Sequence, residues 1–170
     1  METKRFILRP YQNSDLEAIF YNWANDDEVT KYLTWPTHKS LEDTKQILNI
    51  WLEEEKKTVT HRFCIVPKGE DKPIGAIDIP CMHDNIPEIG YCLSRKYWNQ
   101  GIMTEVCHAY IDYLFSIGYT EIIICADERN IASNRVIEKC GFTFTLKETK
   151  ICSSFKPYEV TVNCYKITKG

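Results

Sequence analysis

Five consecutive apolar residues, Ile122 to Ala126, narrow the choice of fold more than any other segment. The run is too short for a helix of its own, and a strand that is buried on both faces reads in this way, usually in a parallel pairing. Apolar residues recur at helical spacing just before it, over 101–117, and Gly118 stands where a helix ends. We therefore expect a helix that connects this strand to the one before it.

The rest of the chain predicts further strands and helices around this unit. Two motifs with the spacing of a capping box, Ser14 to Glu17 and Ser40 to Asp43, mark helix starts. Polar turns join the next strand segments, which is typical of an antiparallel meander. The expected strands are 6–8, 62–66, 74–79, 86–93, 122–126, 143–147 and 160–167, and the expected helices open at 14 and 40 and cover 27–33, 101–117 and 130–140. The fold class is therefore α+β (α/β-like), with a mixed sheet of about seven strands and helices on its faces.

The composition fits one folded domain over residues 1–170, because 44% of the residues are apolar and 26% are charged. A net charge of -3 offers no broad attraction to a nucleic acid, so we expect no such partner. No stretch approaches the roughly 20 apolar residues that span a bilayer, and the N-terminus leads into a strand pattern. We expect a cytoplasmic protein without a membrane segment, either a monomer or a homodimer paired through edge strands.

Eight cysteines and four histidines raise the question of disulfides and metals. The cysteines are scattered singly with no CxxC pair, and most of them lie among apolar residues, as small buried side chains do. We therefore expect reduced thiols. The histidines show no ligand spacing with one another or with cysteine, so we expect neither a metal nor a cysteine–histidine pair.

An anion site is expected where 97–105 joins a strand to a helix. Free backbone N–H groups and the positive end of the helix dipole point out of such a loop, and Gly101 is the small residue that a phosphate needs. A glycine that only caps the helix, without binding an anion, would give the same sequence pattern. Asn130 and Ser133 open the next helix, where they either cap it or hydrogen-bond a ligand. Both helices follow parallel-type strands, so both starts should lie at one sheet edge, where one long ligand can meet them.

Three segments resemble the GNAT superfamily of acetyl-coenzyme A-dependent N-acetyltransferases, and within it the RimJ/RimL type. They are Glu88–Leu93, Tyr97–Glu105 and Asn130–Phe142, and the last matches the spacing N-x-x-S-x-R-V-x-E-K-x-G-F. The resemblance covers nearly the whole chain. It implies that two central strands splay apart, that the pantetheine arm inserts between them, and that the pyrophosphate sits on the backbone amides of 100–104. Met103 departs from the pattern, because the superfamily has a small residue there.

The resemblance also implies which residues contact each ligand. Acetyl-coenzyme A is expected as the acyl donor, and either a peptide N-terminus or a small-molecule amine as the acceptor. Trp35, in a loop beside Pro36, and Glu88 are expected on the acceptor side. The expected cofactor-binding residues are Tyr91, Cys92, Leu93, Asn99, Gln100, Gly101, Ile102, Met103, Thr104, Asn130 and Ser133.

Acetyl transfer needs a neutral amine, a stabilised oxyanion and a proton for the departing thiolate. Glu88 is the candidate base, although an ordinary surface carboxylate would read the same way. Ser133 is the candidate acid, and the backbone N–H of Cys92 or Leu93 is the candidate oxyanion donor. Two alternatives stay open: a catalytically silent acyl-coenzyme A binding module that senses cofactor level, and an interaction protein without a ligand.

Overall fold

A single seven-stranded sheet organises the chain, in the order β1-β2-β3-β4-β5-β7-β6. The protein is described by a computed structural model that covers residues 1–170. The strands are β1 (Phe6–Arg9), β2 (Phe63–Pro67), β3 (Gly75–His83), β4 (Ile86–Leu93), β5 (Glu121–Asp127), β6 (Thr143–Ile151) and β7 (Glu159–Thr168). Every neighbouring pair is antiparallel except β4 with β5, which is parallel. The mixed, mostly antiparallel sheet expected from the sequence is confirmed.

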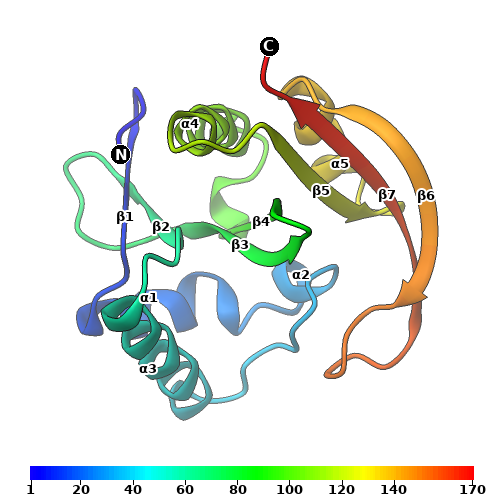
Figure 1. Ribbon diagram of the computed structural model, residues 1–170. Helices are drawn as coiled ribbons and strands as arrows, with labels where there is room; N and C mark the ends of the chain where they lie inside the picture. The colour runs from blue at the N-terminus through cyan, green and yellow to red at the C-terminus, as the bar shows by residue number, and fades with distance from the viewer.

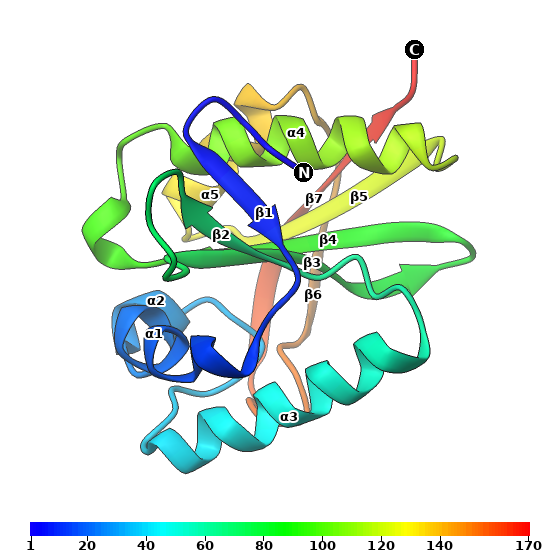
Figure 2. The same cartoon turned by 90° about the vertical axis from the view of Figure 1, so that its left-hand side faces the viewer.

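Helices cover both faces of this sheet. The first three, α1, α2 and α3, lie on one face, and α4 and α5 lie on the other (Figures 1 and 2). Their bounds, with the shorter helical turns, are a 3₁₀ turn (Asn13–Asp15), α1 (Leu16–Ile19), a π turn (Phe20–Ala24), α2 (Asp27–Thr30), α3 (Leu41–Lys57), a 3₁₀ turn (Arg95–Tyr97), α4 (Ile102–Ser116) and α5 (Ile131–Lys139). No helix is both long enough and apolar enough to cross a membrane.

Two apolar clusters hold these layers together. The larger cluster, of 21 buried residues, lies between the sheet and α4 and α5, and Tyr110, Ile122 and Ile137 are among its most buried members. The smaller cluster lies between the sheet and α1 and α3, around Trp23 and Leu48. Each fully buried aliphatic side chain stabilises the fold by about 1.5–3 kcal/mol. The helices are therefore fixed firmly against the sheet that carries the site.

The apolar run in β5 is buried on one face only. Ile122, Ile124 and Ala126 point into the larger cluster, whereas Ile123 and Cys125 on the other face are half-buried. The expectation of a strand buried on both faces is therefore only half right. The parallel pairing that this run predicted is present, and α4 makes the connection from β4.

The capping motif at Ser40 is confirmed, but the one at Ser14 is wrong. Ser40 Oγ accepts from the N–H of Asp43, and Asp43 Oδ2 accepts from the N–H of Ser40 at 3.0 Å. At the first helix it is Asp15 that accepts, from the N–H of Gln12 at 2.8 Å. A carboxylate is a stronger acceptor than a hydroxyl, and a 3₁₀ turn at Asn13–Asp15 precedes α1, which begins at Leu16.

Three element lengths also differ from expectation. Helix α2 is a single turn instead of 27–33: the N–H of Leu33 donates to the carbonyl of Thr30 in a tighter turn, and the ammonium group of Lys156 binds the carbonyl oxygens of Thr30 and Leu33 at 2.7 and 2.8 Å. Strands β3 and β6 run on to His83 and Ile151, where β4 and β7 supply the backbone partners.

Candidate functional site

The parallel ladder between β4 and β5 consists of one register pair, Glu88 with Ile123. Beyond this pair β4 continues to Leu93 and β5 to Asp127 with no further pairing between them. On their outer sides β4 stays paired with β3, and β5 with β7. The two strands therefore splay after Glu88, and the backbone groups on their facing edges have no strand partner.

The β3–β4 hydrogen bonds determine which N–H groups of β4 face this opening. The N–H of Ser94 donates to the carbonyl of Ile74 at 2.8 Å, so Cys92 and its partner in β3 form the next hydrogen-bonded pair. The N–H of Cys92 therefore points to β3. By the same alternation, the N–H groups of Tyr91 and Leu93 point toward β5.

Helix α4 begins at a left-handed glycine. Gly101 has φ of 69° and is the N-cap residue, and Asn99 has φ of 59°. No group of the protein accepts a hydrogen bond from the backbone N–H groups of 100–104. Gly101 is exposed, whereas Met103 is buried in the larger cluster, so its bulk points away from the loop surface. Free N–H groups at a helix start make this loop a ready anion site.

Two side chains hold the loop in place. Trp98 Nε1 donates to the carbonyl of Leu93 at 2.8 Å, which ties the loop to the end of β4. Arg5 donates to the carbonyl of Gln100 at 3.1 Å and pairs with Glu105 at 2.7 Å. The guanidinium group of Arg5 therefore adds a cation beside the free N–H groups.

Helix α5 begins at the same sheet edge, after β5. Asn130 caps it, because its Oδ1 accepts from the N–H of Ser133 at 3.2 Å. The hydroxyl of Ser133 lies 2.9 Å from the hydroxyl of Tyr91, which reaches across from β4. Burial raises the pKa of Tyr91, although the hydrogen bond from Ser133 lowers it in part. Tyr91 therefore keeps its proton throughout the physiological range.

Asn134 fixes the position of this helix start. Its amide nitrogen donates to the carbonyl oxygens of Asp127 and Asn130, at 3.0 and 2.8 Å. Its Oδ1 accepts from the amide of Asn163 at 3.0 Å and from the hydroxyl of Tyr165 at 2.7 Å. One buried side chain thus joins α5 to the end of β5 and to β7.

Two carboxylates lie on the face of the sheet that α1 and α3 cover. Glu88, at the start of the splay, accepts from Nε2 of His83 at 2.6 Å. Asp78 stands beside Gly90 in the β3–β4 register, 3.5 Å from the guanidinium of Arg62. Burial raises the pKa of Asp78 to about 6, against the lowering effect of Arg62.

The negative charge of Glu88 also acts on a lysine of the neighbouring part of the sheet, Lys150. Burial lowers the pKa of Lys150 on β6, but the nearby charges of Glu88, Cys125 and Glu148 outweigh this, so the pKa is raised. Lys150 therefore stays protonated, and it forms an ion pair with Glu148 at 3.8 Å.

The β6–β7 hairpin borders this face together with the loop that follows α2. Besides the two bonds from Lys156, Cys152 Sγ contacts the carbonyl of Leu33 at 3.9 Å. Trp35 lies nearby but is half-buried: it packs against the smaller cluster, with its ring 5.3 Å from that of His38. A contact between Trp35 and the acceptor stays a prediction.

The structure brings the expected residues of the two helix starts together at one sheet edge. Sequence reasoning missed Arg5, Asp78, Asn134 and Lys150. Asp78 had a visible signal, because it interrupts the apolar segment Ala76–Ile79. Arg5 and Lys150 are distant in sequence from the residues on which they act, and a single sequence does not reveal such tertiary contacts.

Comparison with known proteins gives one consistent family. The acetyltransferase (GNAT) domain family matches residues 5–143. The uncharacterized N-acetyltransferase YoaA of Bacillus subtilis (strain 168) is 33% identical over 147 residues, which are 84% of this chain and 81% of YoaA. A GNAT-family acetyltransferase from Bacillus anthracis has a similar crystal structure, with a TM-score of 0.83, 25% identity, and coverage of 99% of this chain and 97% of that one.

A second similar structure contains a ligand. It is RimL, a ribosomal L7/L12 α-N-protein acetyltransferase, in complex with coenzyme A; its TM-score is 0.83 at 20% identity, over 98% of this chain and 95% of RimL. At this identity the likeness concerns the fold alone. The family match over most of the sequence, joined by a relative at 33% identity, establishes that the chain belongs to the GNAT acetyltransferases.

Proposed function

We propose that this protein is an N-acetyltransferase that moves the acetyl group of acetyl-coenzyme A to a primary amine. The proposal depends on one observation: at a single sheet edge, the free N–H groups of α4 and the hydroxyl of Ser133 on α5 flank strands that no longer pair. A long ligand with a diphosphate at one end and a thioester at the other suits this arrangement.

The donor would bind through the backbone of the protein. Its diphosphate would accept hydrogen bonds from the N–H groups of 100–104, with the Arg5 cation alongside. Its pantetheine amides would pair with the unpaired edges of β4 and β5, as an added strand does. The burial of Met103 supports this fit, because its side chain does not project into the space in front of the free N–H groups of 100–104.

The thiolate that leaves coenzyme A needs a proton. Ser133 and Tyr91 offer two hydroxyl groups 2.9 Å apart beside the splay, and burial keeps the pKa of Tyr91 high enough to hold its proton. Ser133 would protonate the sulfur and Tyr91 would orient and resupply it. The N–H of Leu93, which points toward β5, would stabilise the oxyanion in place of the N–H of Cys92.

The acceptor amine would approach from the face that carries the two carboxylates. Glu88 would accept the proton of the ammonium group, since it stands where the splay opens. Asp78 is the second candidate for this role, because burial raises its pKa to about 6, close to working pH. The acceptor itself would be a peptide N-terminus or a small-molecule amine.

Thiol release from acetyl-coenzyme A tests the proposal. Purified protein would be mixed with the donor and a panel of amines: peptides that differ in their first residue, a polyamine and an aminoglycoside. We expect release that depends on at least one amine, with one acetyl group added to it by mass spectrometry. A protein that gains about 2.7 kcal/mol of stability at 100 times the dissociation constant of coenzyme A, yet acetylates no amine, would be the silent binding module instead.

A further inference from the structure

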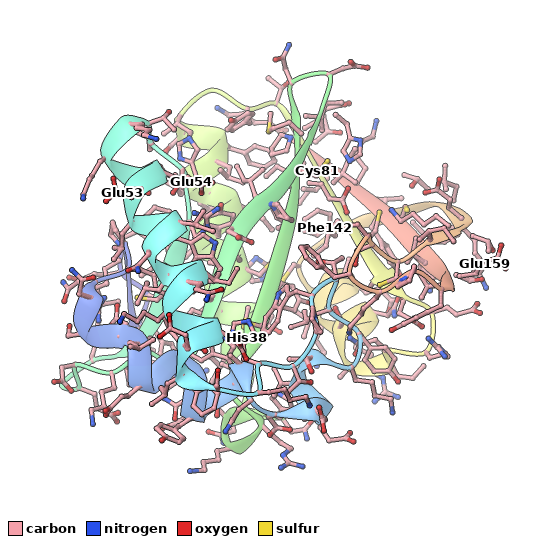
Figure 3. All side chains as sticks on the ribbon, turned by 90° about the horizontal axis from the view of Figure 1, so that it is seen from below. His38, Glu53, Glu54, Cys81, Phe142 and Glu159 are labelled. Carbon is pink, nitrogen blue, oxygen red and sulfur yellow. The ribbon has the colours of Figure 1, made fainter.

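A cluster of three metal-ligating side chains lies on the β3–β4 hairpin. The sulfur of Cys81, a ring nitrogen of His83 and a carboxylate oxygen of Glu88 all lie within 4.8 Å of one another. Figure 3, which views the molecule from the side of α3, shows Cys81 on this hairpin. Thiolate, imidazole and carboxylate are the three ligand types that zinc takes from proteins.

A β-bulge brings the three side chains to the same face. Asp78 pairs with Gly90 and Cys81 pairs with Glu88, so three steps along β3 correspond to two along β4. Side chains alternate between the faces of a strand, and without the extra residue Cys81 would point away from Glu88. The bulge shifts the alternation by one residue, so that Cys81 points to the same face as Glu88. His83, two residues further along β3, points to that face as well.

The scaffold of the cluster is rigid. His83 and Ile86 pair across a two-residue turn, in which Asp84 and Asn85 both have positive φ, at 47° and 71°. This is the turn geometry that matches the twist of a hairpin. Cys81 and Glu88 are directly opposite each other across the strands, so little chain freedom is lost when an ion joins them.

The distances and charges suit a divalent ion. In a tetrahedral zinc site with bonds of about 2.0–2.3 Å, ligand atoms lie roughly 3.3–3.8 Å apart, within the spread of this cluster. His83 and Glu88 already share a hydrogen bond of 2.6 Å, and an ion would take the place of the shared proton. A thiolate and a carboxylate together balance the two positive charges of the ion.

We propose that Cys81, His83 and Glu88 bind a borderline-soft divalent cation of the zinc class, with water at the fourth position, and that the bound ion inhibits acetyl transfer. Cys81 is exposed and the side chain of His83 is 50% exposed, so the ion enters directly from solvent. Ligation occupies the carboxylate of Glu88, which then no longer accepts the proton of the amine. The inhibition rests on the function proposed above; the binding does not.

Cobalt(II) titration of the reduced protein tests the binding, because a thiolate ligand gives Co(II) a charge-transfer absorption. We expect one ion per chain, displaced by Zn²⁺, with an affinity that rises with pH as the thiol loses its proton. Cys81→Ser should abolish the charge-transfer band and weaken Zn²⁺ binding by at least about 100-fold, and His83→Gln should weaken it as well. The matched controls, Cys152→Ser and His108→Gln, should bind as the wild type does.

A charge-transfer band that survives in Cys81→Ser, or that disappears in Cys152→Ser, would overturn the site. Equal thermal midpoints of wild type and Cys81→Ser would show that folding is intact. In the activity assay, Zn²⁺ should lower the wild-type rate and leave that of Cys81→Ser unchanged. Undiminished wild-type turnover with the ion bound would overturn the inhibition. A protein without any acetyltransferase activity would contradict the proposed function, and the cobalt titration would then still test the metal site.

Discussion

The hydroxyl groups of Tyr91 and Ser133 lie 2.9 Å apart and join β4 to α5 beside the point where β4 and β5 stop pairing. Tyr91 comes from a strand and Ser133 from the first turn of a helix, 42 residues later. A thioester held between the strands would meet both hydroxyl groups. In the proposed reaction the pair would therefore link the binding of the donor to the protonation of its sulfur.

Replacing Ser133 by alanine should lower kcat by about 100-fold, the usual contribution of a positioned acid, with little change in KM for acetyl-coenzyme A. Tyr91→Phe should have a smaller effect, because Ser133 keeps its hydroxyl. Steady-state thiol release would measure both. Ser116→Ala is the control, since that hydroxyl only binds the carbonyl of Tyr113 at the far end of α4. Unchanged turnover in Ser133→Ala would exclude it as the acid.

Glu88→Gln should lower kcat/KM by up to about 100-fold, and most strongly at low pH, where the amine carries its proton. Asp78→Asn should change kcat/KM only a few-fold. The two pH profiles decide between the carboxylates. If Asp78→Asn were the inactive variant, and the wild-type activity fell below about pH 6, the base would be Asp78.

Burial of Asp78 also predicts how stability depends on pH. Its pKa is about 6 in the folded protein against a model-peptide value of 3.8, so between these values the folded state binds the proton more tightly than the unfolded state. The free energy of unfolding should therefore fall as the pH rises from about 4 to above 6, by at most about 3 kcal/mol from this group. Asp78→Asn lacks this titration.

Denaturant unfolding of wild type and Asp78→Asn at several pH values would measure the effect. The stability of the variant relative to wild type should rise between pH 4 and pH 7. A difference that stays constant with pH would mean that Arg62 offsets the cost of burying the carboxylate.

Gly101→Ala should raise KM for acetyl-coenzyme A about tenfold, which corresponds to 1.4 kcal/mol, because a methyl group would stand in the phosphate cradle. The left-handed backbone, with φ of 69°, would also cost about 1–2 kcal/mol of stability. Gly118→Ala is the matched control: its φ is 110°, and no atom lies within 4 Å of the added carbon. It should lose stability and keep its KM. Equal KM values for the two variants would argue against phosphate binding at Gly101.

Asn134→Ala should lower the free energy of unfolding by about 1–3 kcal/mol, because it removes the amide acceptor of the buried Tyr165 hydroxyl and one of the two donors to the carbonyl of Asp127. Asn163→Ala, which removes a single bond to the same amide, should cost less than about 1 kcal/mol. Chemical denaturation would compare them. Similar losses in both variants would show that Asn134 does not hold the start of α5.

Much of the fold could be predicted because local patterns and tertiary packing agree. The apolar run at Ile122 to Ala126 predicted a parallel strand, and the spacing from Ser40 to Asp43 predicted a cap that is present. The cap at Ser14 failed, because the neighbouring Asp15 offers a charged acceptor that the capping-box spacing ignores. Helix 27–33 is shorter than predicted, and the carbonyl oxygens at its end are bound by Lys156, more than 120 residues away in sequence.

The position of the candidate site could be predicted where its residues are adjacent in sequence, at the starts of α4 and α5. It was not predictable where a register decides which face a side chain occupies. Pro80 has no N–H to donate and so marks a bulge in a strand, but its effect on Cys81 and His83 depends on the pairing with β4. The histidine spacing alone therefore gave no sign of the cluster with Glu88.

Lys156 holds the β6–β7 hairpin against the end of α2, so these two segments together border the proposed acceptor side. The groups proposed to hold the donor come almost entirely from one continuous stretch, from β4 to the start of α5. The border of the proposed acceptor side comes instead from two short segments that are distant in sequence, the loop after α2 and the β6–β7 hairpin. An exchange of these two segments would therefore alter the acceptor side and leave the stretch proposed to hold the donor unchanged.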